Sequence, residues 1–370
     1  MSDTATLFLF VKGAATSPIE NLVAQAQVAA ALDTLEKMRT LPEIAEIVIA
    51  TADADCAARA AALGARVEMD PPGADFHWGN RIAALVEKYR AAIPLYVGGG
   101  SGALMEVEDW RTLIRRVLDE PGTIVTNNLY SCDFAAWSPG DALTRIEPPA
   151  LDNDLAFRLS EHTQLKVVAL PKNAATQLDI DTPTDLLMIV FHRAVGKTLR
   201  AFLDMARLDT ARVVQILPLV RNRDATLLIA GRVSASMSLF LERETRCQWR
   251  IFSEERGMRA SGREARGEAR SLLGFHLDQV GASRFFATLA SLADAAIIDS
   301  RVLFAHRRLQ PTAPDRFHAD LLEPEQIGDP FVREFAAAAR AASIPVLLGG
   351  HSLVSGGMYA LVDAAARVAH

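Results

Sequence analysis

The feature that most constrains the fold is a regular alternation of apolar runs with helical patterns in the first half of the chain. The expected strands are 6–11, 46–51, 65–69 and 94–98, and the expected helices are 19–41, 54–64 and 80–90. Strands that alternate with helices form βαβ units, which build a mainly parallel sheet. We therefore expect a three-layer α/β domain with a mainly parallel sheet.

A second α/β domain is expected after the string 178–196. The helix that begins near Thr184 would leave the first sheet, so we place one domain at 1–195 and another at 196–370. Apolar runs return beyond that point, again separated by helical patterns. The strands expected in this second domain are 225–231, 247–253, 294–300 and 344–350.

Length and composition agree with two globular domains. The chain has 370 residues, more than one hydrophobic core usually supports, and half of them are apolar. A net charge of -6 without a long basic block argues against a nucleic-acid partner or an acidic membrane surface. Cys56, Cys132 and Cys247 lie far apart, which argues against a zinc site or a disulfide framework and suits a reducing cytoplasm. We expect a cytoplasmic protein without a membrane span.

Several loops of the first domain should share one face. Ligands of open parallel sheets bind beyond the carboxyl ends of the strands, where the loops starting at Lys12, Gly98 and Thr126 are expected. Lys12 and Gly13 follow the first strand and lead into a helix, so they could contact a triphosphate. The alternative is an exposed lysine at a strand end.

The string 177–188, QLDIDTPTDLLM, is the most specific in the chain. It places Asp179 and Asp181 two apart on an extended segment, so both side chains point the same way. Such a carboxylate pair suits Mg²⁺. The alternative is a well-capped helix, with Thr182 as the cap, Pro183 at the first position and Asp185 at the third.

Taken in order, these segments resemble a known family. The resemblance covers residues 6 to about 195, and its strings are VKGAATSPIENL, IVIAT, WGNRIAALVEKYR, TNNLYS and LDIDTPTDLL. Together they resemble the MobA-like nucleotidyltransferases, and among these the guanylyltransferases of coenzyme F420 synthesis, which join a nucleoside monophosphate to phospholactate or phosphoenolpyruvate. The resemblance implies a nucleotidyltransferase-like (GT-A/Rossmann-like) fold and transfer of a nucleotide to a phosphorylated small molecule.

The resemblance also implies roles for particular residues. Lys12 would contact nucleotide phosphates and act in catalysis, and Gly79 and Asn80 would lie near the base or ribose. Asn127 or Asn128 would line the acceptor side, and Asp179 and Asp181 would bind Mg²⁺, with Asp181 also catalytic. The implied substrates are a nucleoside triphosphate such as GTP and a phosphorylated acceptor. A homo-oligomer stays open as an alternative to a monomer.

The string LYVGGGSGALM, 95–105, departs from that family. The aligned strand in the family usually ends in an aspartate that helps to bind the metal, whereas this chain has Gly98, Gly99, Gly100 and Ser101. Glycines let a phosphate approach the backbone closely, so this loop could bind a ligand without a metal. The alternatives are therefore a metal-dependent transferase, a non-catalytic relative that binds a nucleotide or metabolite, and a simple tight turn.

The end of the second domain has a further candidate anion site. A strand, a glycine-rich loop with His351, Ser352 and Ser355, and a helix follow one another at 345–368. A hydrolase or lyase centred on His351 is the third functional class. The arginines between 256 and 270 would form one basic stripe if 256–273 were helical. That stripe would be a solvated face or a contact to an anion or a partner subunit.

Overall fold

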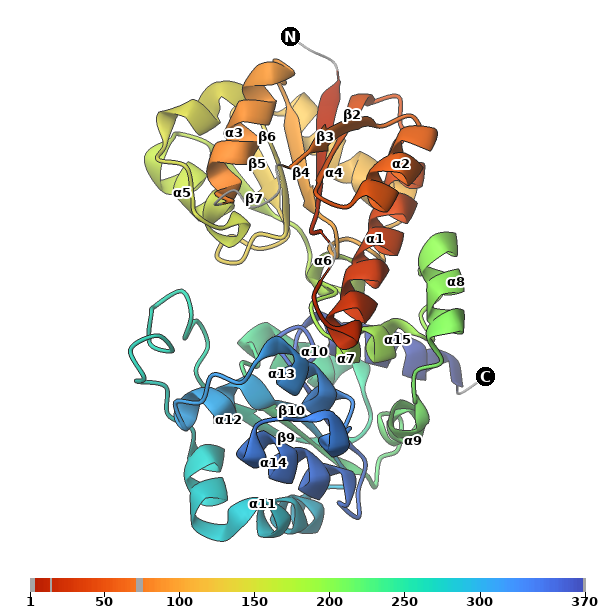
Figure 1. Ribbon diagram of the computed structural model, residues 1–370, viewed down its shortest axis with the longest axis vertical. Coiled ribbons are helices and arrows are strands. Elements are labelled where there is room, and N and C mark those ends of the chain that lie inside the picture. Colours follow the sequence, from red (N-terminus) through yellow and green to blue (C-terminus); the bar gives the residue numbers. More distant parts are fainter. Residues whose placement is uncertain (1–3, 14, 71–75, 369–370) are drawn as a thin grey trace. The chain divides into compact units, whose positions relative to one another are not determined.

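The apolar runs of the first half lie side by side as strands of one seven-stranded sheet (Figure 1). The computed structural model describes residues 4–13, 15–70 and 76–368. The strands are β1 (Ala5–Val11), β2 (Ile44–Thr51), β3 (Arg66–Met69), β4 (Pro94–Gly98), β5 (Thr123–Thr126), β6 (Phe134–Trp137) and β7 (Lys166–Ala169). All four strands predicted for this half are present.

The strand order is β3-β2-β1-β4-β6-β5-β7, and β6 is antiparallel to both of its neighbours. The remaining pairs are parallel. The mainly parallel sheet expected from the sequence is confirmed. Because β6 runs against the others, it begins at the edge of the sheet where β1, β2, β4 and β5 end.

Helices cover both faces of this sheet and complete three layers. Leu7 and Leu9 of β1 pack with α1 (Pro18–Met38), α2 (Ala54–Ala62) and α4 (Val107–Asp119). Phe8 and Phe10 pack on the opposite face with α3 (Trp78–Lys88) and α5 (Leu155–His162). Alternate side chains of a strand point to opposite faces, so an apolar run such as β1 supplies both cores.

The second half forms a four-stranded parallel sheet in the order β11-β10-β8-β9. Its strands are β8 (Thr226–Gly231), β9 (Gln248–Ser253), β10 (Ala295–Asp299) and β11 (Val346–Gly349). The helices around it are α7 (Pro183–Ile189), α9 (Ala211–Leu219), α10 (Ala235–Glu244), α11 (Leu272–Leu292), α12 (Ser300–His306), α13 (Ala313–Asp320), α14 (Pro330–Arg340) and α15 (Gly356–Val368). The expected second α/β domain is therefore confirmed, with all four predicted strands.

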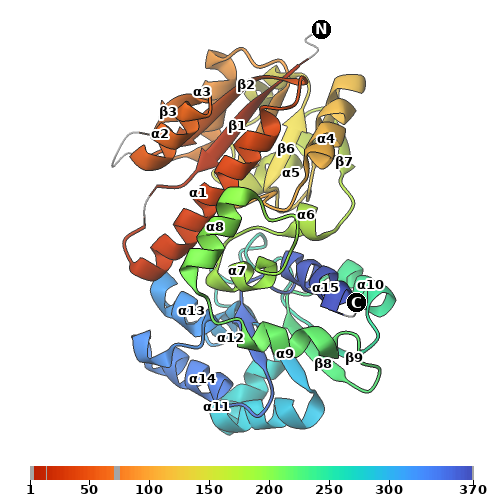
Figure 2. The same ribbon diagram turned by 90° about the vertical axis from the view of Figure 1, so that its right-hand side faces the viewer.

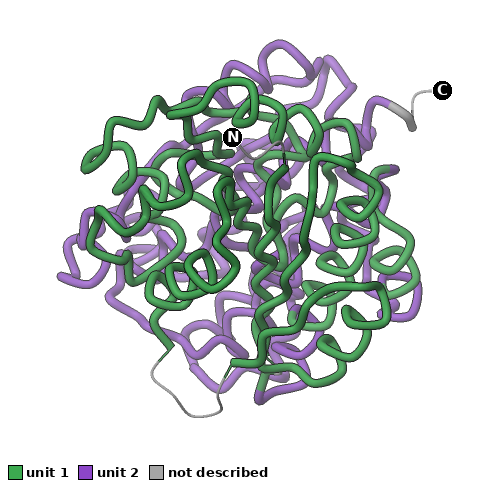
Figure 3. The backbone as a smooth tube through the Cα atoms, turned by 90° about the horizontal axis from the view of Figure 1, so that it is seen from above, with its two compact units in different colours: residues 1–15, 24–179, 194–202 green, residues 16–23, 180–193, 203–370 purple. Residues whose placement is uncertain are grey.

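The chain divides into two compact units whose boundaries are interleaved in sequence (Figure 3). The first unit contains 1–15, 24–179 and 194–202, and the second contains 16–23, 180–193 and 203–370. Asp179 therefore ends a segment of the first unit, and α7 belongs to the second. A single boundary after residue 195 stays a prediction. In Figure 2 the start of α8 (Lys197–Ala206) lies along α1, and the Asp33 side chain accepts bonds there from the Thr198 and Leu199 amides.

The helix on which the basic stripe depended is absent. Residues 254–271, which carry all five arginines of that stripe, form successive turns and no helix. Gly257, Gly262 and Gly267 have positive φ angles, which a right-handed helix excludes. Elsewhere in the described parts of the chain, no helix combines the length and apolarity needed to span a bilayer.

Candidate functional site

The carboxyl edge of the seven-stranded sheet gathers most of the residues singled out in the first half. Phe10 of β1 pairs with Gly98 of β4, so Lys12 and the glycine turn start at adjacent strand ends. Thr126 ends β5, which is parallel to β4, so Asn127 starts at the same edge. The shared edge expected for these three loops is present.

Lys12 is a cationic group at this edge. Its side chain is exposed, and within the described ranges no carboxylate lies within ion-pair distance of it. Gly13 follows, and a Cβ there would lie 3.2 Å from Cβ of Ala52. A lysine without a protein carboxylate keeps its charge available to an anionic ligand.

Packing explains much of the glycine turn after β4. Gly102 has a φ of +65°, and a Cβ there would lie 2.5 Å from the Trp110 ring. At Gly99 a Cβ would lie 3.1 Å from the Phe10 carbonyl, and at Gly98 it would lie 3.0 Å from Oγ of Ser101. The turn is closed by a bond from the Ser101 amide to the Gly98 carbonyl at 3.0 Å. A tight turn is therefore sufficient to explain why residue 102 is glycine. Gly100 lies within the same turn.

Ser101 connects this turn to the aspartate string. It forms an isolated antiparallel bridge with Asp179, and its Oγ donates a hydrogen bond of 3.2 Å to Oδ1 of Asp179. Ser101 is 3% exposed, whereas Asp179 is half-buried. The turn therefore fixes one carboxylate of the predicted pair at the carboxyl edge of the sheet.

Asp133 is a second carboxylate at this turn, and the sequence analysis missed it. Its carbonyl accepts the Gly98 amide at 3.0 Å, and its Oδ2 accepts Nδ2 of Asn127 at 2.7 Å. Asn127 is buried, accepts the Asp133 amide through its own Oδ1, and has its carbonyl bonded by Gln177. Asn127 thus orients Asp133, while the neighbouring Asn128 caps a turn by accepting the Tyr130 amide.

The carboxylates at this edge are of the kind that binds Mg²⁺ in proteins. Among the described residues no group of three histidine, cysteine, aspartate or glutamate side chains converges as a metal site. Mg²⁺ usually binds through one or two protein carboxylates plus phosphates and water, so Asp133 and Asp179 meet that requirement.

Gly79 and Asn80 lie at the start of α3, which follows β3 and begins at the same edge of the sheet. The Gly79 amide donates to the Pro149 carbonyl at 3.0 Å, and a Cβ at Gly79 would lie 2.4 Å from that oxygen. Close packing therefore requires this glycine. Asn80 is exposed, and its amide is capped by Nδ1 of His77. A role near the base or ribose stays a prediction for both.

The second half of the aspartate string lies in the second unit. Oδ2 of Asp185 accepts bonds from the Asp181 and Thr182 amides and from the Thr182 hydroxyl, which completes a capping box for α7. Thr184 donates to the Leu348 carbonyl at the end of β11. The capped-helix alternative is thus confirmed. The Asp181 side chain is exposed, and its role as a metal ligand or catalytic group stays a prediction.

His351, Ser352 and Ser355 form the turn between β11 and α15, as expected. The Ser352 carbonyl accepts the Ser355 and Gly357 amides at 3.1 and 2.8 Å, so these amides are already paired. Desolvation by the surrounding protein, followed by the charge of Arg232, lowers the pKa of His351, although the residue as a whole is exposed to solvent. The anion site at these three residues stays a prediction.

No family model and no curated protein matches the chain. Two similar solved structures are CMP:2-keto-3-deoxy-manno-octonic acid synthetase complexed with CTP and a cytidylyltransferase from Leptospira borgpetersenii serovar Hardjo-bovis. The first is 15% identical with a TM-score of 0.37, covering 55% of this chain and 99% of its own. The second is 13% identical with a TM-score of 0.41, covering 56% and 94%. Similarity at this level does not identify an activity.

Proposed function

We propose that the first unit is a nucleotidyltransferase, which transfers a nucleoside monophosphate from a triphosphate to the phosphate of a small molecule and releases pyrophosphate. The acceptor phosphate oxygen bonds to the α-phosphorus as the bond to the pyrophosphate oxygen breaks. The sequence resemblance favours GTP as the donor and a phosphorylated hydroxy acid or enol as the acceptor.

The observation that carries this proposal is that Lys12 and the turn that contacts Asp133 and Asp179 follow two adjacent strands at one edge of the sheet. Lys12 follows β1, and the turn after the neighbouring β4 bonds to both Asp133 and Asp179. Nucleotidyl transfer needs alignment of two phosphates and cations that neutralise the developing charge.

Each residue has a proposed role. Asp133 and Asp179 would hold Mg²⁺, which neutralises charge on the phosphates when bound. Lys12 contacts the triphosphate of the donor, and Asn127 keeps Asp133 in its orientation through the 2.7 Å bond. Asp181, from the sequence analysis, stays a proposed additional ligand.

The proposal is tested with the full chain by measuring pyrophosphate release. The four nucleoside triphosphates are each combined with phospholactate, phosphoenolpyruvate and related acceptors, with and without Mg²⁺. We expect turnover with one donor, and we expect Asp179→Asn and Asp133→Asn each to lower kcat/KM by roughly 100-fold or more, because each removes a charged metal ligand.

Asp141→Asn is the matched control, because the exposed Asp141 side chain pairs with Arg145 one helical turn away. It should leave turnover unchanged. The contrary outcome is no turnover with any acceptor, together with nucleotide binding that depends neither on Mg²⁺ nor on Asp133 and Asp179. That result would favour a non-catalytic nucleotide-binding protein over a transferase.

A further inference from the structure

Two adjoining cavities lie in the second unit, where the loop 254–271 packs beside the residues that follow α12. Their volumes are about 370 and 300 Å³. Both are lined by Glu264, Ala265, Leu309 and Gln310, so they lie side by side, and together they are called the arginine pocket here. The charges that line this pocket determine what it can bind.

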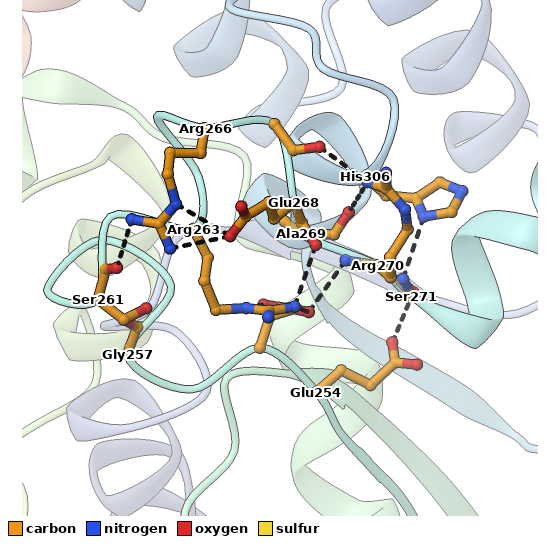
Figure 4. A network of polar contacts seen from close by, with 12 residues as sticks. Glu254, Gly257, Ser261, Arg263, Arg266, Glu268, Ala269, Arg270, Ser271 and His306 are labelled. Atoms are coloured by element: carbon orange, nitrogen blue, oxygen red, sulfur yellow. Dashed lines mark hydrogen bonds and ion pairs between the residues drawn. The ribbon is translucent and has the colours of Figure 1, made fainter.

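The loop that forms one wall is held in a fixed conformation. Glu255 accepts two bonds from Arg263, at 2.8 and 3.0 Å, and a third from the Arg270 amide at 2.9 Å. Met258 and Ala269 are buried in a small apolar cluster against α12. Figure 4 shows Arg263, Arg266 and Glu268 joined in the polar network of this loop. The arginines of the loop are therefore presented on an ordered wall.

Among the described residues, five guanidinium groups line the arginine pocket, and three of them have carboxylate partners. Arg259, Arg301 and Arg316 line one cavity, and Arg266 and Arg308 line the other. The ion pairs are Arg259 with Glu264 at 2.9 Å, Arg266 with Glu268 at 2.8 Å, and Arg301 with Asp320 at 2.6 Å.

Arg316 and Arg308 have main-chain acceptors instead. Arg316 donates to the Pro311 carbonyl at 2.6 Å, and Arg308 donates to the Gly267 carbonyl at 3.2 Å. In the described ranges neither has a carboxylate within ion-pair distance. Five cations against three carboxylates leave an excess of two positive charges, in a chain whose net charge is -6.

Arg316 shows the electrostatic consequence of this excess. Its side chain is half-buried, and desolvation followed by repulsion from Arg301 and Arg259 lowers its pKa below the usual range for arginine. Clustered guanidinium groups that repel one another are stabilised by a bound anion, which removes that repulsion.

We propose that the arginine pocket binds a small phosphate monoester, with the phosphate between Arg259, Arg301 and Arg316. A phosphate monoester carries about -1.5 to -2 charges at pH 7, which matches the excess, and arginine forks bind phosphate oxygens in a bidentate manner. The pocket is larger than a phosphate ion, and Phe304 and Leu309 offer apolar contacts to an attached organic group. This site is independent of the proposed transferase site.

Calorimetric titration of the full chain with glycerol phosphate and with inorganic phosphate tests the proposal. We expect Arg316→Gln to weaken glycerol phosphate binding by at least about 10-fold, since it removes charge-assisted hydrogen bonds. Arg308→Gln should weaken glycerol phosphate binding as well. Because Arg308 is exposed, this second variant tests the proposal even if Arg316→Gln does not fold. Arg340→Gln is the matched control, because Arg340 pairs with Glu325 on the surface of α14.

The pH dependence identifies the charge of the ligand. Affinity should rise between about pH 5 and 7, as the phosphate loses its second proton near pH 6. If inorganic phosphate binds more tightly than glycerol phosphate, the pocket is a site for free phosphate and the monoester proposal is wrong. Absence of millimolar binding by the wild type, or binding unchanged in both Arg316→Gln and Arg308→Gln, would overturn the proposal.

Discussion

At the scale of single residues, the glycine turn after β4 is explained first by packing. We predict that Gly102→Ala destabilises the first unit by roughly 2–4 kcal/mol, because it combines a positive φ with a Cβ placed 2.5 Å from Trp110. Gly64→Ala is the control: Gly64 has a φ of +90°, but a Cβ there would meet no atom within 4 Å beyond its chain neighbours. It should cost about 1–2 kcal/mol, the cost of the backbone angle alone.

Urea unfolding of both variants measures the difference. Equal losses would show that Trp110 moves aside, so that the backbone angle alone requires glycine. Gly99 has no positive φ, so Gly99→Ala tests close approach to the Phe10 carbonyl and should cost less than Gly102→Ala.

The position of Asp133 at the candidate site could not be predicted from the sequence. Lys12, Asn127 and Asp179 were singled out because each sits beside a recognisable strand or string. Asp133 precedes β6, and a residue before a parallel strand would lie at the opposite edge of the sheet. Only the antiparallel direction of β6, which no local pattern revealed, brings Asp133 to the site.

Asp185 provides a prediction about pH. Burial, and then the charge of Asp181, raise the pKa of Asp185 to about 7 from an ordinary value of 3.8. The folded chain therefore binds this proton more tightly than the unfolded chain. Its stabilising contribution is complete below about pH 4 and is lost as the pH rises through about 7, by at most about 1.4 kcal/mol per unit.

Asp185→Asn keeps an acceptor for the cap of α7 and removes the titration. Between pH 5 and 8 the free energy of unfolding should therefore fall more steeply for the wild type than for this variant. Parallel stability profiles from urea titrations at pH 5, 6, 7 and 8 would show that Asp185 is already ionised in the folded chain.

At the scale of elements, strands were predicted more successfully than turns. Most of the predicted strands, such as β1, β4, β8 and β10, are buried apolar runs, whereas β3 and β9 are partly exposed strands. The arginines between 256 and 270 fit helical spacing, but three glycines with positive φ and the bonds to Glu255 favour a folded loop. Spacing alone does not detect such tertiary contacts.

The loop itself can be tested through its anchor. We predict that Glu255→Gln accelerates amide hydrogen exchange across 256–268 by about 10-fold or more, because a half-buried charged acceptor of three bonds is lost. Glycerol phosphate binding should weaken in parallel, since Arg259 and Arg266 lie on this loop. Glu325→Gln, which alters only an exposed pair, is the control. Unchanged exchange in Glu255→Gln would mean that packing of Met258 and Ala269 suffices to order the loop.

At the scale of the whole molecule, the sites proposed in the two units differ in chemistry. The first has two carboxylates and a lysine suited to a metal-bound triphosphate, and the second has an excess of guanidinium charge suited to a phosphate without a metal. The sequence predicted both α/β sheets, but it could not predict the arginine pocket. That pocket depends on which arginines have carboxylate partners, which is a property of the tertiary structure.

The last prediction separates these sites within one intact chain. Asp179→Asn should remove the Mg²⁺ dependence of nucleoside triphosphate binding and leave glycerol phosphate binding unchanged. Arg316→Gln should weaken glycerol phosphate binding and leave the Mg²⁺ dependence of nucleoside triphosphate binding unchanged. Each substitution alters a group within one unit only. Raising the salt concentration should weaken glycerol phosphate binding to the arginine pocket, because its exposed guanidinium groups are screened. Calorimetry of the wild type and both variants with both ligands measures all of these effects. Loss of both ligands in either variant would show that the two sites are energetically coupled, and would contradict independent binding.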